Sequence, residues 1–245
     1  MAMSIPDFVR PTLQRLDVAL DEAQLERLAR YLDLLLEANR RVNLTAVREP
    51  EAAWHRLILD SLTLAPGLEP LGEGAALIDI GSGGGLPGIP LAIARPDLHF
   101  TLLEATGKKA RFLQQCVDEL PLTNAHVLND RAEHVGQDAA HRQRYELAMA
   151  RAVGSVAEVL EYALPLVKVG GRVLAMKGKA GESELAAAGD ALSVLGAGEV
   201  QVIEAYPDEP ADPAARELIV ISVVKDRPTP RAYPRRAGLP RHEPL

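Results

Sequence analysis

The segment DIGSGGGLPGIP, residues 79–90, follows the apolar run AALI and carries five glycines between Gly81 and Gly88. Glycine adopts positive φ angles without strain and lets a ligand approach the main chain closely. An apolar strand that runs into such a loop and then into a helix is typical of parallel α/β sheets, which bind ligands at the carboxyl ends of their strands. This segment therefore predicts a fold class and also the edge of the sheet at which a ligand binds.

The chain after residue 75 agrees with that fold, because short apolar segments alternate with helical ones. We predict strands at 75–80, 99–104, 124–128, 145–150 and 171–176. We predict helices near 87–95, 106–120, 155–164 and 182–195. The last two apolar segments, EVQVIEAY and RELIVISVVK, have no helix between them and should pair as an antiparallel hairpin. The expected fold is α/β and Rossmann-like, with a mostly parallel sheet of seven strands that ends in this hairpin.

The first 65 residues lack this alternation and are predicted to form a small helical extension. Five leucines recur there at helical spacing after Asp21, which can cap the helix together with Gln24. They are Leu25, Leu28, Leu32, Leu35 and Leu36. We therefore divide the chain into an N-terminal helical extension over residues 1–65 and a sheet domain over residues 66–245. The end of the second domain, residues 225–245, is a basic and proline-rich tail.

Composition excludes several classes of protein. The single cysteine cannot form an intrachain disulfide, and the six histidines show no metal-ligand spacing, so no metal is expected. No apolar run of about eighteen residues is present and the N-terminus lacks a signal pattern, so we expect a cytoplasmic protein without a membrane span. The net charge of −7 argues against bulk attraction to nucleic acid, although the tail has six Lys or Arg residues against two acids.

Polar residues follow each predicted parallel strand. Asp79 ends the first strand and Glu104 the second, while the third leads into NDRAEH; Arg151 and Lys177 follow the fourth and fifth strands. The carboxyl ends of parallel strands meet at one edge of a sheet, so these side chains should lie around one crevice.

The glycine loop itself allows two interpretations. Read from Gly83, GGGLPG matches the dinucleotide fingerprint G-x-G-x-x-G, which would indicate a nicotinamide-dependent oxidoreductase. Pro87 and Pro90 count against it, because they bracket the start of the helix that would hold the pyrophosphate. Read from Asp79, the acid-x-G-x-G-x-G pattern resembles the first motif of class I S-adenosylmethionine-dependent methyltransferases, with room for the methionine part beside Gly81, Gly83 and Gly85.

A more specific resemblance covers the chain from about residue 40 to its end. The matching motifs are RVNLTAV (41–47), LDSL (59–62), DIGSGGGLPGIPLAI (79–93), RAE (131–133), RAV (151–153), MKG (176–178) and TPRAYPRRAGLPRHEPL (229–245). Together they resemble the ribosomal RNA small subunit methyltransferase G family, formerly called glucose-inhibited division protein B. The resemblance implies a class I methyltransferase fold, S-adenosylmethionine as cofactor, and methylation of N7 of one guanine in 16S ribosomal RNA, position 527 in the usual rRNA numbering.

The resemblance also implies a set of cofactor-binding residues. Gly81 and Leu86 would line the cofactor, Glu104, Ala105 and Thr106 would lie near its ribose, Ala132 and Glu133 would flank its adenine, and Arg151 would close the pocket. This chain departs from the family at Gly84-Gly85-Leu86, where Ala-Gly-Phe is more common. It also has Leu57 where the family has a histidine, so His55 is assigned no role.

Guanine N7 has a lone pair and no proton, so its methylation needs no general base, and we assign none. Catalysis should come from positioning and electrostatics, for which Arg151 and Lys177 are the candidates. The sole cysteine, Cys116, lies on the apolar side of a predicted helix and is interpreted as a core residue.

Contacts with RNA phosphates are expected from basic residues near the crevice and from the tail. The candidates are Arg40, Arg41, Lys108, Lys109, Arg231, Tyr233, Arg235 and Arg236. Replacing Arg235 and Arg236 by alanine should then weaken RNA methylation and leave cofactor affinity intact. The expected partner is 16S rRNA in the small ribosomal subunit or in an assembly intermediate, bound by a monomer. A non-enzymatic assembly factor with a degenerate cofactor pocket is the remaining alternative.

Overall fold

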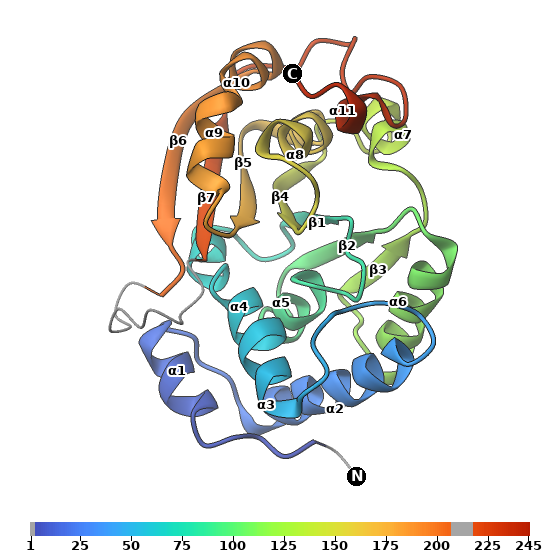
Figure 1. Ribbon diagram of the computed structural model, residues 1–245, viewed down its shortest axis with the longest axis vertical. Helices are drawn as coiled ribbons and strands as arrows, with labels where there is room; N and C mark the ends of the chain where they lie inside the picture. Colours follow the sequence, from blue (N-terminus) through green and yellow to red (C-terminus); the bar gives the residue numbers. More distant parts are fainter. Residues whose placement is uncertain (1–2, 207–217) are drawn as a thin grey trace.

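The centre of the computed structural model, which describes residues 3–206 and 218–245, is a seven-stranded sheet in the order β3-β2-β1-β4-β5-β7-β6 (Figure 1). Its strands are β1 (Ala76–Ile80), β2 (His99–Leu103), β3 (Ala125–Leu128), β4 (Tyr145–Arg151), β5 (Val167–Lys177), β6 (Ala197–Glu204) and β7 (Ile219–Lys225). Strands β1 to β5 pair in parallel, and β7 is antiparallel to both of its neighbours. The predicted α/β class, mostly parallel sheet and terminal hairpin are confirmed.

Helices connect the strands and extend the chain at both ends. They are α1 (Val9–Arg15), α2 (Glu22–Asn39), α3 (Pro50–Ala53), η1 (Trp54–Leu59), α4 (Asp60–Leu62), η2 (Ala65–Leu68), α5 (Gly88–Ala94), α6 (Gly107–Glu119), α7 (Ala132–Gln137), α8 (Val156–Ala163), α9 (Gly181–Ala187), α10 (Gly189–Leu195) and α11 (Leu239–His242). The single helix expected over 182–195 is in fact two helices that meet at Ala188. Helix α7 was not predicted, because six residues are too few to show a helical period.

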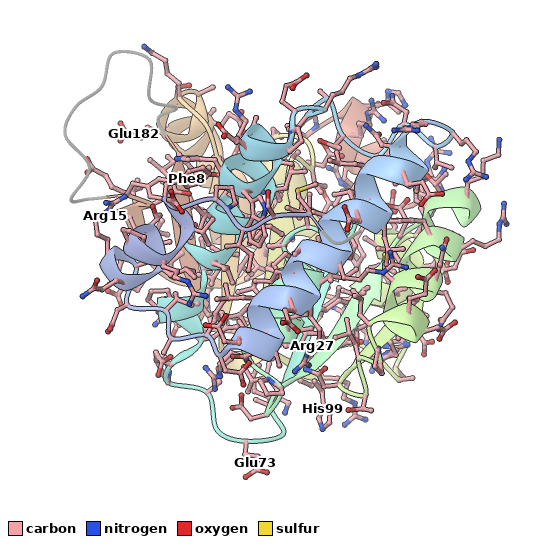
Figure 2. All side chains as sticks on the ribbon, turned by 90° about the horizontal axis from the view of Figure 1, so that it is seen from below. Phe8, Arg15, Arg27, Glu73, His99 and Glu182 are labelled. Atoms are coloured by element: carbon pink, nitrogen blue, oxygen red, sulfur yellow. The ribbon has the colours of Figure 1, made fainter. Side chains whose placement is uncertain are left out.

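Alternation along the strands gives the sheet two apolar faces. Leu77 and Phe100 face one core, which they share with α1 to α6, whereas Ile78 and Ile80 face a second core under α8 and α10. Figure 2 shows α2 running across the first layer, between α1 and α6. The N-terminal helices therefore pack on the same face of the sheet as α5, the helix that follows the glycine loop.

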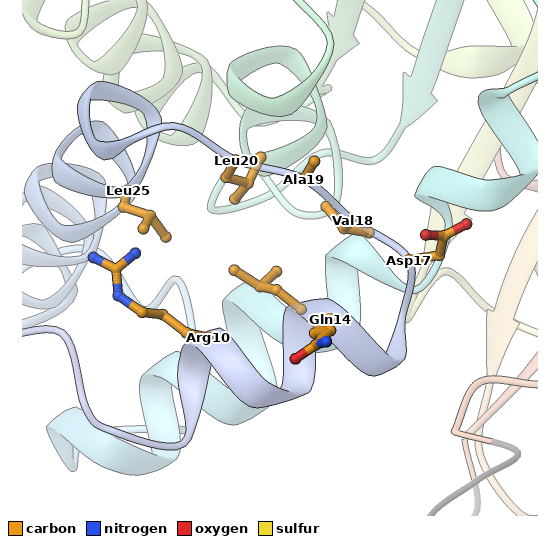
Figure 3. Close-up of a pocket in the computed structure, with 8 residues that line it drawn as sticks. Arg10, Gln14, Asp17, Val18, Ala19, Leu20 and Leu25 are labelled. Atoms are coloured by element: carbon orange, nitrogen blue, oxygen red, sulfur yellow. The ribbon is translucent and has the colours of Figure 1, made fainter.

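Helix α2 begins where the sequence predicts. The Asp21 side chain accepts from the Gln24 amide at 2.7 Å while the Gln24 side chain accepts from the Asp21 amide at 2.9 Å, which completes a capping box. A cavity of about 310 Å³ separates α1 from α2 (Figure 3), and its lining residues all come from these helices and the turn between them. Over residues 3–206 and 218–245, no helix has the length and apolar character needed to cross a membrane.

Candidate functional site

The glycine loop lies at the carboxyl end of β1, beside the point where strand order reverses between β1 and β4. Gly81, Gly83 and Gly85 have φ angles of 69°, 57° and 95°, which explains why glycine is needed at each. A Cβ built on Gly83 would meet one described atom within 4 Å, the Gly81 carbonyl oxygen at 3.6 Å, so open space lies beside it. Leu86 is half-buried at the end of the loop.

Gly85 does not offer the room for a ligand that we expected. It is buried, and a Cβ on it would lie 2.4 Å from Ile89 Cδ1 and 3.1 Å from the Tyr31 hydroxyl. The small residue is needed here so that the loop can pack against its own helix and α2. The open space for a ligand therefore lies beside Gly83; Gly81 is exposed, but a Cβ on it would lie 2.8 Å from Val153 Cγ2.

Helix α2 packs against the glycine loop and holds it in place. The buried Tyr31 hydroxyl donates to the Gly84 carbonyl at 2.6 Å. A Cβ on Gly84 would lie 2.9 Å from Leu35 and 3.6 Å from Leu44, so the segment after α2 also packs on the loop. Tyr31 is a site residue that the sequence pattern does not reveal, because its spacing on α2 matches an ordinary core position.

Asp79 is fully buried and serves first as a structural acceptor. Its Oδ2 accepts from the Gly88 amide at 3.0 Å, whereas Oδ1 has no hydrogen-bond partner among the described residues. Burial raises the pKa of Asp79 to about 7, against the lowering effects of the Ser82 hydroxyl and the Gly88 amide. The Asp79 carboxylate already accepts from the Gly88 amide at the start of α5, so one fewer backbone donor is available there to a pyrophosphate. This counts against the nicotinamide hypothesis.

Glu104 joins the ends of β1 and β2. One carboxylate oxygen accepts from the Gly83 amide at 3.0 Å and the other from the Thr106 amide at 2.7 Å. Its backbone carbonyl accepts from the Asn129 side chain at 2.7 Å, which ties in the end of β3. An ionised carboxylate has about four acceptor positions, so two remain for a ligand beside exposed Ala105 and Thr106.

The end of β3 leads into α7, where Ala132 is half-buried and Glu133 is buried. Glu133 Oε1 accepts from the Gly238 amide of the C-terminal tail at 2.7 Å. The structure thus brings the tail to the position that the resemblance gives to the adenine, a proximity that no local pattern in the sequence indicates.

Arg151, at the end of β4, is held by the helical run of residues 54–62. Its guanidinium donates to the Arg56 carbonyl and, at 3.4 Å in each case, to Ser61 Oγ and Asp60 Oδ2. Arg56 lies within η1, which is π-helical, and Asp60 and Ser61 follow it in α4. Asp60 also accepts from the Tyr206 hydroxyl at 2.9 Å. Asp60 had no assigned role, although a lone acid within LILDSLTLA was a signal that could have revealed it.

Lys177 does not face the crevice as an available cation, contrary to our expectation. Its ammonium group is buried and donates to the Gly154 carbonyl and to Glu184 Oε2, the latter at 2.9 Å. Its role is to hold the loop after β4, in which Ala152 has a φ of 55°. A non-glycine residue with positive φ is uncommon and costs conformational energy.

The expected RNA-binding residues fall into two groups. Arg40, Arg41 and Lys108 are exposed near the last turn of α2 and the first of α6, with Lys109 half-buried beside them. In the tail, Arg231 and Arg236 are exposed and Tyr233 is half-buried.

For two cations of the tail, the structure contradicts the expected contact with RNA phosphates. Arg235 forms an ion pair with Glu161 at 2.6 Å, and Lys225, named with the tail, is fully buried and donates to the carbonyls of Leu164 and Val167, each at 2.7 Å. Both are occupied within the protein, and burial lowers the pKa of Lys225 to about 8. Neither is available for phosphate.

Cys116 is fully buried in the core, as predicted, and burial raises the pKa of its thiol above the range where a nucleophile would work. The His55 ring lies between those of Phe8 and Tyr206, with centroids 6.0 and 5.9 Å away. In the part of the chain that the structure describes, no three His, Cys, Asp or Glu side chains gather in a way that could hold a metal.

Comparisons with known proteins identify the fold and the family of this chain. The solved structure of an S-adenosylmethionine-dependent O-methyltransferase from Thermotoga maritima, 15% identical in sequence, covers 79% of this chain and 71% of its own with a TM-score of 0.52. That likeness supports the fold. A Chloroflexus aggregans protein named ribosomal RNA small subunit methyltransferase G is 47% identical over 228 residues, 93% of each chain.

A protein of the same name from Leuconostoc citreum is 39% identical over 99% of this chain and 100% of its own. The sequence profile GidB, described as rRNA small subunit methyltransferase G, matches residues 24–210. The chain therefore belongs to the rRNA small subunit methyltransferase G family.

Proposed function

We propose that this protein transfers the methyl group of S-adenosylmethionine to N7 of one guanine of 16S rRNA, acting as a monomer in the cytoplasm on the small ribosomal subunit or an assembly intermediate. One observation carries the proposal: Glu104 joins the glycine loop to the end of β2 and keeps acceptor positions for a ligand. Family membership supplies the RNA and the reaction.

The residues at the strand ends fit this cofactor. Open space beside Gly83 leaves room for the methionine part. The remaining acceptor positions of Glu104 suit the two hydroxyls of the ribose. Half-buried Ala132 would lie against the adenine.

When bound, S-adenosylmethionine supplies the methyl group from a positively charged sulfonium. The chain's own contribution is to hold cofactor and base in line, since guanine N7 needs no base to attack. Arg151 is the cation at the end of β4, and its contacts with Asp60 and Arg56 fix where it lies. A fixed donor there can bind guanine O6 or a nearby phosphate and orient the base.

RNA would reach the site over the basic surface around the end of α2. Arg40 and Arg48 line a groove of about 750 Å³ on one side of that helix, and Arg41, Lys108 and Arg111 line a second of about 230 Å³ on the other. Because Leu44 packs on Gly84, this surface lies next to the glycine loop. Its cations can therefore bind phosphates while a base reaches the cofactor.

The reaction is tested by incubating the protein with labelled S-adenosylmethionine and small-subunit particles from cells that lack the enzyme. We expect label in 16S rRNA and chemical cleavage at one N7-methylguanine. If the protein binds the cofactor and no label enters the RNA, it is a non-enzymatic factor and the proposal fails.

The RNA surface is tested by the salt dependence of particle binding. Replacing Arg40 and Arg41 by alanine should reduce the slope of log affinity against log salt by roughly 1.4 to 1.8, about 0.7 to 0.9 for each lost phosphate contact. Arg27→Ala, on the same helix but earlier in it, is the matched control. Equal slopes for both variants would place the RNA elsewhere.

A further inference from the structure

The C-terminal strap, residues 229–242, runs back over the body of the protein. It passes α8 and ends beside α7, where α11 lies (Figure 1). At its start, the buried Thr229 hydroxyl donates to the Leu195 carbonyl at 2.7 Å. A segment whose composition suggests a solvated basic arm is therefore docked along its length.

Helix α7 depends on this strap. It has six residues, too few for a helix to be stable by itself. Glu133 accepts from the Gly238 amide at 2.7 Å, and the Gln137 side chain donates to the carbonyls of Arg231 at 3.1 Å and Pro234 at 2.8 Å. Gly136 contacts Pro234 so closely that a Cβ there would lie 2.7 Å from the proline ring. Half of the residues of α7 are thus held by the strap.

The strap is in turn anchored to α8 through a buried ion pair. Arg235 Nε donates to both carboxylate oxygens of Glu161, at 2.9 and 3.1 Å, and Nη2 donates to one of them at 2.6 Å. The Arg235 amide adds a bond to the same carboxylate at 2.8 Å. The Glu161 side chain is 1% exposed, so little water competes with these bonds.

Arg142 is a second anchor between α7 and the strap. Its Nη1 donates to the Gly136 and Tyr233 carbonyls, both at 2.7 Å, and its Nη2 donates to the carbonyls of Thr229 at 2.8 Å and Pro230 at 3.1 Å. One guanidinium therefore satisfies four backbone acceptors that join the end of α7 to the strap.

We propose that the strap is a positioning element for the cofactor site: it fixes α7, and with it Ala132 and Glu133, and so sets the affinity for the adenosyl part of S-adenosylmethionine. This rests on the proposed location of the adenine at the start of α7. The Gly238 amide of the strap donates directly to Glu133, so a shift of the strap moves the start of α7, which forms one wall of the proposed site. Arg235 acts here through Glu161, with which it forms an ion pair at 2.6 Å.

The test is calorimetric titration with S-adenosylhomocysteine, well below the melting temperature. Gln137→Ala removes both of its strap bonds and leaves no buried charge; we expect about a 3- to 10-fold rise in Kd, since a hydrogen bond contributes about 1 kcal/mol. Gln114→Ala, which removes a surface bond to Asp118 on α6, is the matched control and should not change Kd. Arg235→Met should raise Kd further, with the salt slope of RNA binding unchanged.

The outcomes separate this inference from the proposed site. If Ala132→Trp leaves Kd unchanged, the adenine does not lie at α7 and the proposed site fails. If Ala132→Trp abolishes binding and Gln137→Ala binds like Gln114→Ala, the site stands and the strap has no positioning role. If Gln137→Ala lowers only the melting temperature, its contribution is to stability alone and the inference is overturned. The Kd of Arg235→Met is interpreted only if this variant unfolds cooperatively. If it does not, Gln137→Ala alone decides whether the strap positions the cofactor site.

Discussion

Asp79→Asn tests the electrostatics of the site most directly. The substitution keeps the shape of the side chain and an oxygen that can accept from the Gly88 amide, but it cannot ionise. In the wild type, burial raises the pKa of Asp79 to about 7, from an ordinary value of 3.8. The ionised form is therefore favoured more in the unfolded chain than in the folded one.

The size of the effect follows from linkage. At about 1.4 kcal/mol for each pKa unit, the difference between 3.8 and about 7 corresponds to about 4 kcal/mol. A group whose folded pKa is raised contributes its full stability below the unfolded pKa and loses it as the pH rises through the folded pKa. Wild-type stability should fall by about 4 kcal/mol between about pH 4 and pH 8, and about 3 kcal/mol of that fall lies between about pH 5 and pH 8.

The assay is urea unfolding of both proteins at several pH values and constant ionic strength. Because an asparagine side chain does not titrate, the free energy of unfolding of the variant minus that of the wild type should increase by about 3 kcal/mol from about pH 5 to pH 8. A difference that stays constant across this range would show that Asp79 titrates near its ordinary pKa, and the argument from burial would be wrong.

Two further substitutions test local geometry. Ala152→Gly should raise the free energy of unfolding by about 1 kcal/mol, because glycine adopts a φ of 55° without the cost paid by a Cβ; a loss of stability in urea unfolding would contradict this. Tyr31→Phe should lower it by about 1 to 3 kcal/mol, because the buried Gly84 carbonyl loses its donor. The same variant should also bind S-adenosylhomocysteine more weakly, and unchanged affinity would mean that α2 does not hold the glycine loop in its binding form.

The fold could be predicted because its signals are local. Strand β1 was expected at 75–80 and runs over Ala76–Ile80, since an apolar run that ends in a glycine loop needs no distant partner to be identified. The place of Glu104 followed from the same logic, because the end of β2 must lie beside the end of β1 in a parallel pair. Short elements such as α7 have no period of their own, and their position depends on tertiary contacts.

Side-chain roles that depend on distant partners could not be predicted. In the sequence, Arg235 and Lys225 are two more cations in a basic tail. In the structure, Arg235 pairs with a carboxylate 74 positions away, and Lys225 donates to carbonyls 58 and 61 positions away. The acid that pairs with Arg235 is Glu161 of α8. The sequence predicts this helix, but it does not indicate that the proline-rich tail packs against it. Charge composition therefore overestimated the surface available to RNA.

Several of the contacts that hold the site come from residues outside the seven-stranded sheet and its connecting helices. Tyr31 of α2 holds the loop after β1, Asp60 of α4 holds Arg151 at the end of β4, and the strap holds α7 after β3. Each of these loops joins a strand to a helix at the edge where the cofactor is proposed to bind. A parallel sheet fixes where its strands end, but the conformation of each loop depends on what packs against it. Cofactor affinity in this protein should therefore respond to substitutions in the helices that precede β1 and in the C-terminal strap, even where the substituted residue does not touch the cofactor.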